Sequence, residues 1–186
     1  MFDELVNSLL QESFRPFKAK ERLDQLKKTP GGALKAALIT KKRDPNVEKA
    51  LLNREKNNFE TSLLTSDLVN YAKNVIQDRW PEAEPYILRS PYNSTWYAIN
   101  VIKGAWPEAE PVIKDNARLS SLYARHASKD RFEQGEPAIL KNPDEIVDYA
   151  IHVLGHRWPE AEPILKADNE APWHEYKAYF GIEEKK

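Results

Sequence analysis

The string Trp-Pro-Glu-Ala-Glu-Pro occurs three times in this chain of 186 residues, beginning at Trp80, Trp106 and Trp158. The first two copies are 26 residues apart and the last two are 52 apart, so one copy is missing from a regular series. At the missing position stands Phe132, within "RFEQGEPAIL", which keeps the aromatic residue, the second glutamate and the second proline. A fixed period of this length is typical of proteins built from stacked structural repeats. The sequence therefore predicts four repeats of 26 residues.

Two further residue types recur in the same register. A tyrosine followed by alanine stands nine residues before each aromatic residue of the motif, at Tyr71, Tyr97, Tyr123 and Tyr149. The second glutamate of the motif is always followed by proline, at Glu84, Glu110, Glu136 and Glu162. Because the repeats differ at many other positions, we infer that the geometry of a repeat requires these shared ones.

Each repeat is predicted to contain two helices. The first is opened by Ser-Pro or Asn-Pro, as at Ser90 and Asn142, where a polar side chain can accept a free backbone N–H and proline suits the first helical position. In the first repeat, one stripe at helical periodicity contains Leu68, Ala72, Val75, Ile76 and Arg79. The second helix is predicted to begin at the first proline of the motif, where Glu82 and Glu84 suit the positive end of the helix dipole.

Short helices of about ten residues are marginal alone, and they bury their apolar faces only by stacking. The sequence therefore predicts an all-α fold in which residues 64–166 form a right-handed helical-hairpin repeat array, an α-solenoid of about four repeats. Residues 167–186 are expected to supply a capping helix and a charged tail. Pro172 opens this helix, and its stripe consists of Trp173, Tyr176 and Phe180.

Residues 1–60 have a different pattern and are expected to form an N-terminal helical region. An amphipathic helix is predicted over residues 2–14, with its apolar stripe at Phe2, Leu5, Val6, Leu9 and Leu10. A basic segment, a Thr-Pro-Gly-Gly break and a helix opened by Asp44-Pro45 follow. Either these helices cap the repeat array or the first is a detachable docking element, and we favour the cap.

Composition excludes several classes of function. The 28 basic and 29 acidic side chains give a net charge of −1, which removes the overall attraction on which nucleic-acid binding relies. The absence of cysteine excludes disulfides, thiolate metal sites and a cysteine nucleophile. No apolar run is long enough for a membrane span, and the N-terminus is acidic where a secretory signal is basic. We expect a soluble protein that is not exported.

Candidate catalytic and metal-binding residues have simpler interpretations. Glu82 and Glu84 are two positions apart, so on a helix they point in different directions and do not form a catalytic pair. The motif glutamates are instead expected to pair with the arginines that precede the aromatic residue, Arg79, Arg131 and Arg157.

His152 and His156 are spaced as two zinc ligands on a helix would be, but no acidic third ligand stands at an adjacent helical spacing. The chain also lacks a glycine-rich phosphate loop and a nucleophile elbow. We therefore predict no metal, no cofactor and no enzymatic activity.

The recurring aromatic residues are expected to act as wedges at the joint between the two helices of a repeat, together with the motif glutamates. These joint residues are Trp80, Trp106, Phe132 and Trp158 with Glu84, Glu110, Glu136 and Glu162. Tryptophans beside arginines are also frequent hot spots of interfaces and can stack on bases, which is the alternative interpretation.

A better candidate for a binding surface lies three residues after each tyrosine. There the sequence has Asn74, Asn100, His126 and His152, just outside the apolar stripe of the first helix. With the tyrosines they would form a polar ladder along the array. The alternative, which we favour slightly, is that the tyrosine hydroxyls tie adjacent repeats together.

The repeat "YAINVIKGAWPEAEPVI", preceded by Ser-Pro, resembles the short tandem helical repeats of many uncharacterised proteins of tailed bacteriophages. The resemblance covers residues 64–166. It implies no catalytic residues, and it implies a location in the bacterial host cytoplasm or in the phage virion.

The leading hypothesis of function is a non-enzymatic protein–protein interaction module that engages a host or virion protein, with no membrane partner. The first alternative is a structural component of the phage particle. The second is a nucleic-acid binder that uses the basic stretch Arg15–Arg43, which predicts binding that weakens strongly with salt.

Overall fold

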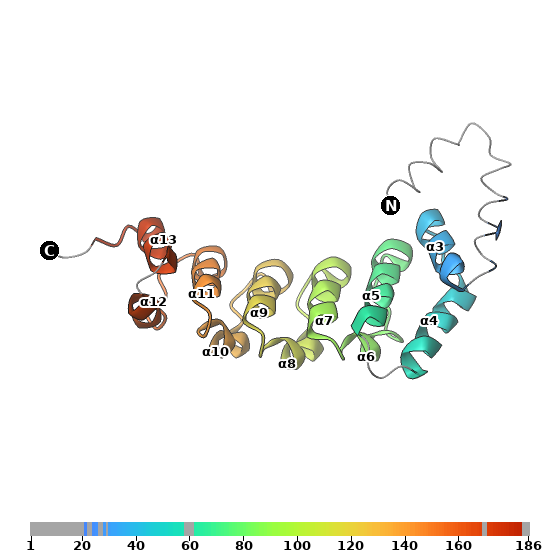
Figure 1. Ribbon diagram of the computed structural model, residues 1–186, viewed down its shortest axis with the longest axis horizontal. Coiled ribbons are helices and arrows are strands. Elements are labelled where there is room, and N and C mark those ends of the chain that lie inside the picture. Colours follow the sequence, from blue (N-terminus) through green and yellow to red (C-terminus); the bar gives the residue numbers. More distant parts are fainter. Residues whose placement is uncertain are drawn as a thin grey trace, which may run out of the picture. The chain divides into compact units, whose positions relative to one another are not determined.

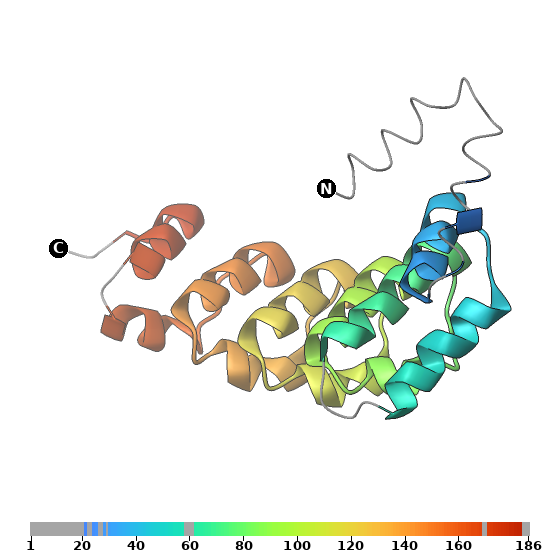
Figure 2. The same ribbon diagram turned by 45° about the vertical axis from the view of Figure 1, so that its right-hand side comes forward.

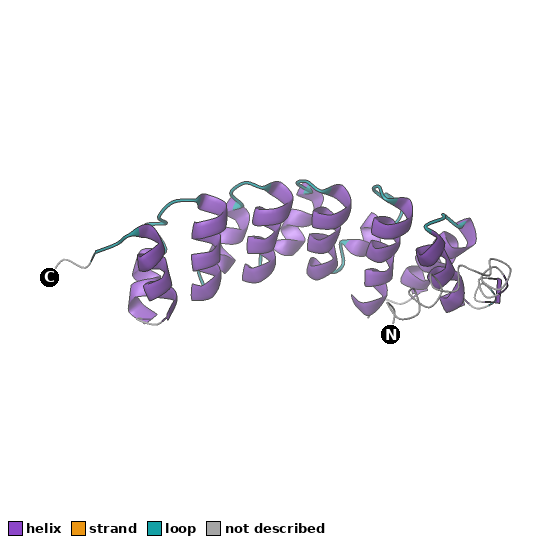
Figure 3. Ribbon diagram, turned by 90° about the horizontal axis from the view of Figure 1, so that it is seen from above, coloured by secondary structure: helices purple, strands orange, loops and turns teal. Residues whose placement is uncertain are grey.

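The computed structural model describes residues 30–57, 62–168 and 171–183, together with Glu21, Asp24, Gln25 and Lys28. Throughout these residues the regular structure is helical, and Figure 3 draws no strand among them. This confirms the predicted all-α class. None of the helices described is both long and apolar enough to cross a membrane. The predicted helix 2–14 lies outside the described residues. So does most of the first half of the basic stretch Arg15–Arg43, which is the part that precedes Pro30.

The chain divides into two compact bodies, Met1–Ala83 and Glu84–Lys186, and each is described by itself. The N-terminal body contains α3 (Pro30–Thr40), α4 (Pro45–Asn57) and α5 (Ser62–Tyr71), which η2 (Ala72–Ile76) continues. Helix α4 packs against both α3 and α5. The core of this body is formed by side chains of Ala36, Val47, Leu51, Leu68 and Trp80.

The C-terminal body alternates long and short helices along the chain. The long helices are α7 (Pro91–Tyr97) with η3 (Ala98–Ile102), α9 (Ala117–Tyr123) with η5 (Ala124–Ser128), α11 (Pro143–Tyr149) with η7 (Ala150–Leu154), and α13 (Ala171–Phe180). The short helices are α6 (Glu84–Ile87), η4 (Pro107–Ala109) with α8 (Glu110–Ile113), η6 (Glu133–Gly135) with α10 (Glu136–Ile139), and α12 (Glu162–Asp168). Neighbouring long helices lie side by side in one row, and the short helices form a second row (Figures 1 and 2).

The long helices begin at the polar residues that the sequence predicts. Ser90 Oγ accepts a hydrogen bond from the backbone nitrogen of Asn93 at 3.3 Å, and the Asn142 side chain accepts one from Glu145 at 3.4 Å. Asn116 caps α9 in the same way, with 3.0 Å to the nitrogen of Leu119. Each cap satisfies an N–H group that has no partner within the first helical turn.

The long helices end in a way that the sequence does not predict. Helices α5, α7, α9 and α11 continue into the π-helical turns η2, η3, η5 and η7, and each turn is closed by a residue in the left-handed region, with φ values of 60° at Gln77, 57° at Lys103, 55° at Lys129 and 67° at Gly155. The backbone nitrogen of Lys103 donates to the oxygen of Ala98, five residues back, at 2.7 Å. That alanine follows the recurring tyrosine and is fully buried, so the Tyr-Ala pair marks where the π-helical turn begins.

The short helices begin later than predicted. The first proline of the motif opens a single 3₁₀ turn, in which the nitrogen of Ala109 donates to the oxygen of Trp106 at 2.9 Å. The α-helix itself starts at the second glutamate, Glu110, and the proline after it stands in the first turn, where a missing N–H costs nothing. The predicted second helix of about ten residues is therefore too long, because this 3₁₀ turn replaces its first three residues.

The third repeat has glycine where the others have alanine. A Cβ atom added to Gly135 would lie 2.6 Å from Ser120 and from the Phe132 ring, closer than real Cβ contacts come. The long helix α9 approaches the 3₁₀ turn η6 more closely than an alanine side chain allows.

Candidate functional site

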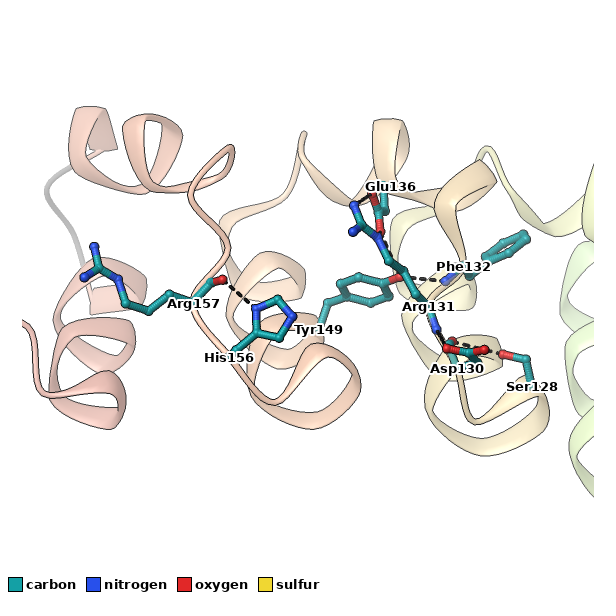
Figure 4. A network of polar contacts seen from close by, with 8 residues as sticks. All are labelled: Ser128, Asp130, Arg131, Phe132, Glu136, Tyr149, His156 and Arg157. Carbon is teal, nitrogen blue, oxygen red and sulfur yellow. Dashed lines mark hydrogen bonds and ion pairs between the residues drawn. The ribbon is translucent and has the colours of Figure 1, made fainter.

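In the C-terminal body, one hydrogen-bond pattern links each long helix to the motif that precedes it. The hydroxyl of Tyr149 accepts the backbone N–H of Phe132 at 2.7 Å and donates to Glu136 at 3.2 Å, and Figure 4 shows the ring extending toward both. Tyr123 accepts from Trp106 at 2.7 Å and donates to Glu110 at 3.0 Å. We call each such set of tyrosine, aromatic residue and glutamate a joint.

The pattern continues at both ends of the C-terminal body. Tyr97 donates to Glu84 at 3.2 Å. At the other end, Tyr176 accepts the backbone N–H of Trp158 at 2.5 Å, so the predicted capping helix α13 carries a tyrosine in the role of the recurring ones.

In two of these joints an arginine binds the glutamate with two nitrogens. Arg131 donates to the two oxygens of Glu136 at 2.6 and 2.9 Å, and Arg157 donates to those of Glu162 at 2.7 and 2.8 Å. The predicted pairing with motif glutamates is thus confirmed for Arg131 and Arg157, and the partner is the second glutamate. Bidentate, charge-assisted bonds of this kind are the strong ones among protein hydrogen bonds, and this pairing raises the pKa of Arg131.

The aromatic residue of each motif is buried between the elements that it joins. The exposed fraction is 3% at Trp80, 1% at Trp106, 4% at Phe132 and 2% at Trp158. Each ring packs on the tyrosine nine residues before it, for example Trp106 on Tyr97 with a centroid distance of 5.1 Å. The structure therefore places these residues as wedges in the core.

The tyrosines do not lie on the surface, which corrects the predicted ladder of Tyr71, Tyr97, Tyr123 and Tyr149 with exposed partners. All four are fully buried. The physical reason is that the motif supplies both an N–H donor and a carboxylate acceptor, so the hydroxyl can be buried without losing hydrogen bonds. Burial, opposed by the hydrogen bond from Trp106 and reinforced by Glu110, raises the pKa of Tyr123 to about 12.

The other half of the predicted ladder is more exposed. Asn74, His126 and His152 are exposed and Asn100 is half-buried. Asn74 and Asn100 each donate to the carbonyl oxygen four residues earlier on their own helix, at 2.9 Å, and His152 lies 3.6 Å from Asp148. The side chains of Asn74, Asn100 and His152 are thus engaged by their own helices.

The two histidines of the rejected zinc site have separate partners. His156 Nδ1 lies 2.8 Å from the carbonyl oxygen of Arg157 (Figure 4), whereas His152 faces Asp148. Among the residues that the structure describes, three or more histidine, aspartate or glutamate side chains do not gather around one point.

An exposed aromatic pair on α7 is the feature that sequence reasoning missed. Tyr92 is 57% exposed and Trp96 is 36% exposed, and their ring centroids are 6.0 Å apart. Asn100 continues the same stripe one helical turn later. We call Tyr92, Trp96 and Asn100, with the residues in register on α9 and η5, namely Arg118, Leu122 and His126, the aromatic face. The signal that could have found it is a pair of aromatic residues four apart and outside the apolar stripe.

A further joint, in the N-terminal body, was also missed. Tyr71 accepts the backbone N–H of Asp44 at 2.9 Å and donates to Glu48 at 3.2 Å, and Arg43 binds both oxygens of Glu48 at 2.8 and 2.9 Å. The hydrogen bond from Arg43 lowers the pKa of Glu48. Aspartate replaces the aromatic residue here, and Tyr71 follows it by 27 residues instead of 17, which removes this joint from the 26-residue register.

The joint and the aromatic face are therefore the two features from which a function can be argued. No family model, no curated protein and no solved structure matches this chain.

Proposed function

We propose that this chain is a non-enzymatic α-helical repeat protein, a right-handed α-solenoid that acts as a protein–protein interaction module. The joints support the solenoid, since each one connects a long helix only with the motif directly before it, as expected when repeats contact their neighbours alone. The aromatic face supports the interaction role, and Trp96 with Tyr92 is the observation that carries it.

This pair is far more exposed than the recurring aromatic residues of the motif. The recurring aromatic residues of the motif are almost fully buried. The large apolar rings of Tyr92 and Trp96 are instead exposed to solvent, on a helix whose opposite side is packed. Tyrosine, tryptophan and arginine are the residue types most enriched among the hot spots of protein interfaces. Arg118, which is 76% exposed, stands in register on the neighbouring long helix α9.

The polar groups of the joints have structural tasks, which supports a non-enzymatic role. The tyrosine hydroxyl, the glutamate and the arginine of a joint are hydrogen-bonded to one another and to the backbone. Groups that satisfy each other in this way stabilise a packing arrangement and leave no proton donor or nucleophile poised toward solvent.

The resemblance to phage repeat proteins suggests a host or virion protein as the partner, in the bacterial cytoplasm or in the particle. A structural role in the particle predicts that mass spectrometry of purified particles detects the chain in stoichiometric amounts.

Nucleic-acid binding predicts an affinity for DNA or RNA that falls steeply with salt. Arg43, at the end of the basic stretch, is already paired with Glu48, which makes this alternative less favoured.

Affinity capture from a lysate of infected bacteria tests the interaction role. We expect wild-type protein to retain a partner that a Tyr92→Ala, Trp96→Ala double variant loses at least about tenfold, since hot-spot truncation costs about 2 kcal/mol or more. Tyr179→Ala is the matched control, because Tyr179 on α13 is also an exposed aromatic residue, at 59%. Equal capture by the wild-type protein and the double variant would refute the role of this face.

A further inference from the structure

One joint of the C-terminal body lacks its arginine. Arg131 and Arg157 stand directly before the aromatic residue, and each binds the second glutamate of its own motif through two nitrogens. Before Trp106 the chain has Ala105, which is exposed. An alanine side chain ends at Cβ, so Glu110 receives no guanidinium from its own motif.

The contacts of Glu110 show what remains of the joint. One carboxylate oxygen accepts the Tyr123 hydroxyl at 3.0 Å, as in the other joints. The second oxygen accepts the side-chain nitrogen of Gln134 at 3.2 Å, from the third repeat. Within the described part of the chain, no lysine or arginine forms an ion pair with this half-buried carboxylate. Glu136, in contrast, has both oxygens on one arginine.

Gln134 is itself a departure from the repeat. The other repeats have glutamate in this position, at Glu82, Glu108 and Glu160. A glutamate at position 134 would place a second carboxylate within hydrogen-bonding distance of Glu110, where like charges repel, whereas the glutamine amide donates a hydrogen bond. The loss of the arginine and the change to glutamine thus occur around the same carboxylate. Together they leave the half-buried Glu110 carboxylate with a neutral amide donor in place of a guanidinium.

We propose that Glu110 binds an arginine side chain of a protein partner, which takes the place beside Ala105 that the Arg131 guanidinium takes beside Glu136. The arrangement of Tyr123 and Glu110 reproduces the one that receives a guanidinium in the next repeat. The planar guanidinium matches both carboxylate oxygens at once, and a lysine ammonium offers only a point charge. This inference rests on the proposed function, because an arginine from outside the chain arrives on a partner.

A selection of random peptides tests the proposal with full-length protein. The library is selected in parallel on wild type and on two variants, Ala105→Arg and Glu110→Gln. Ala105→Arg restores the residue found in the other joints and is expected to remain folded, with the new guanidinium occupying Glu110. Glu110→Gln removes the charge but keeps an acceptor for the Tyr123 hydroxyl, so the two variants block the site in independent ways.

We expect peptides selected by wild type to be enriched in arginine over lysine by about tenfold, and to bind both variants at least about tenfold more weakly, consistent with a charge-assisted bidentate pair. Peptides that bind wild type and Ala105→Arg equally would overturn the arginine site and leave the interaction role intact. A selection that yields no arginine-bearing peptide would overturn the arginine site as well, and the capture experiment with Tyr92 and Trp96 then decides the interaction role separately.

Discussion

The hydroxyl oxygen of Tyr149 lies 2.7 Å from the backbone nitrogen of Phe132, seventeen residues earlier in the chain. The same hydroxyl donates to Glu136, which Arg131 holds through two bonds (Figure 4). A side chain of one repeat thus fixes the backbone of the preceding repeat at the point where its direction changes. The stability of the array should depend on these joints more than on the propensity of its short helices.

Tyr149→Phe removes only the hydroxyl of the joint. We expect the free energy of unfolding to fall by about 1 to 3 kcal/mol, because the buried N–H of Phe132 and the Glu136 carboxylate both lose a partner. Urea denaturation followed by circular dichroism measures the change. Tyr179→Phe, at an exposed tyrosine, should change it by less than about 0.5 kcal/mol, and similar losses in the two variants would contradict the role of the joint.

Trp106→Ala empties the wedge position of the second repeat. The ring is 1% exposed and packs on Tyr97, so we expect a loss of about 3 to 5 kcal/mol from lost burial and the cavity left behind. Thermal unfolding measures the effect, with Trp96→Ala as the control because the same residue type is partly exposed there. A stable Trp106→Ala protein that loses a binding partner would instead assign Trp106 to a binding site.

Alkaline pH should weaken the joints. Burial raises the pKa of Tyr123 from 10.0 to about 12, so the folded state holds this proton more tightly than the unfolded chain does. The contribution to stability is therefore complete below about pH 10 and is lost as the pH rises toward 12. Denaturation curves across this window check the prediction, and Tyr123→Phe should show a smaller decline than wild type. A decline of equal size in the variant would exclude Tyr123 as its cause.

The left-handed residues that close the long helices offer a paired test. Gly155→Ala should lower the free energy of unfolding by about 1 kcal/mol, because φ of 67° is unfavourable for a residue with a Cβ. Lys103→Gly, at φ of 57°, should raise it by up to about 1 kcal/mol for the same reason. Chemical denaturation measures the free energy of unfolding of both variants. A change of the same sign in the two would contradict this backbone geometry.

The contact between Gln134 and Glu110 can be tested by a double-mutant cycle. Gln134→Glu should destabilise the protein by about 0.5 kcal/mol at low salt, since it places a second carboxylate next to that of Glu110. In the Ala105→Arg background, the new guanidinium should reduce or remove this loss. Equal losses in both backgrounds would show that position 134 and position 105 do not act on the same carboxylate.

The class of the fold and the recurring positions could be predicted from the sequence, because they depend on local signals. Ser90 and Asn142 are recognisable as caps from their own chemistry and that of the following proline, and they do cap α7 and α11. The pairing of Arg131 and Arg157 with motif glutamates follows from opposite charges in a short stretch. Such signals need no knowledge of which repeat packs on which.

What the sequence did not reveal depends on contacts between distant residues. Tyr123 stands at the edge of an apolar stripe, and its burial becomes favourable only once Trp106 and Glu110 supply hydrogen bonds from another repeat. The positive φ of Lys103 has no local signal, because lysine does not favour that region. The joint at Asp44 was missed since aspartate contributes only its backbone N–H to Tyr71, and any residue except proline has that group.

Each joint tyrosine of the C-terminal body bonds only to the motif directly before it. This has a consequence for how such a chain changes in evolution. Duplication or deletion of one 26-residue segment, such as the one from Tyr97 to Leu122, leaves every surviving tyrosine with an N–H group and a glutamate at the required spacing. Copy number is then free to vary while the bonding of the remaining segments is conserved. Under the proposed function, the length of the array, and with it the span of surface offered to a partner, can then be selected independently of the stability of each segment.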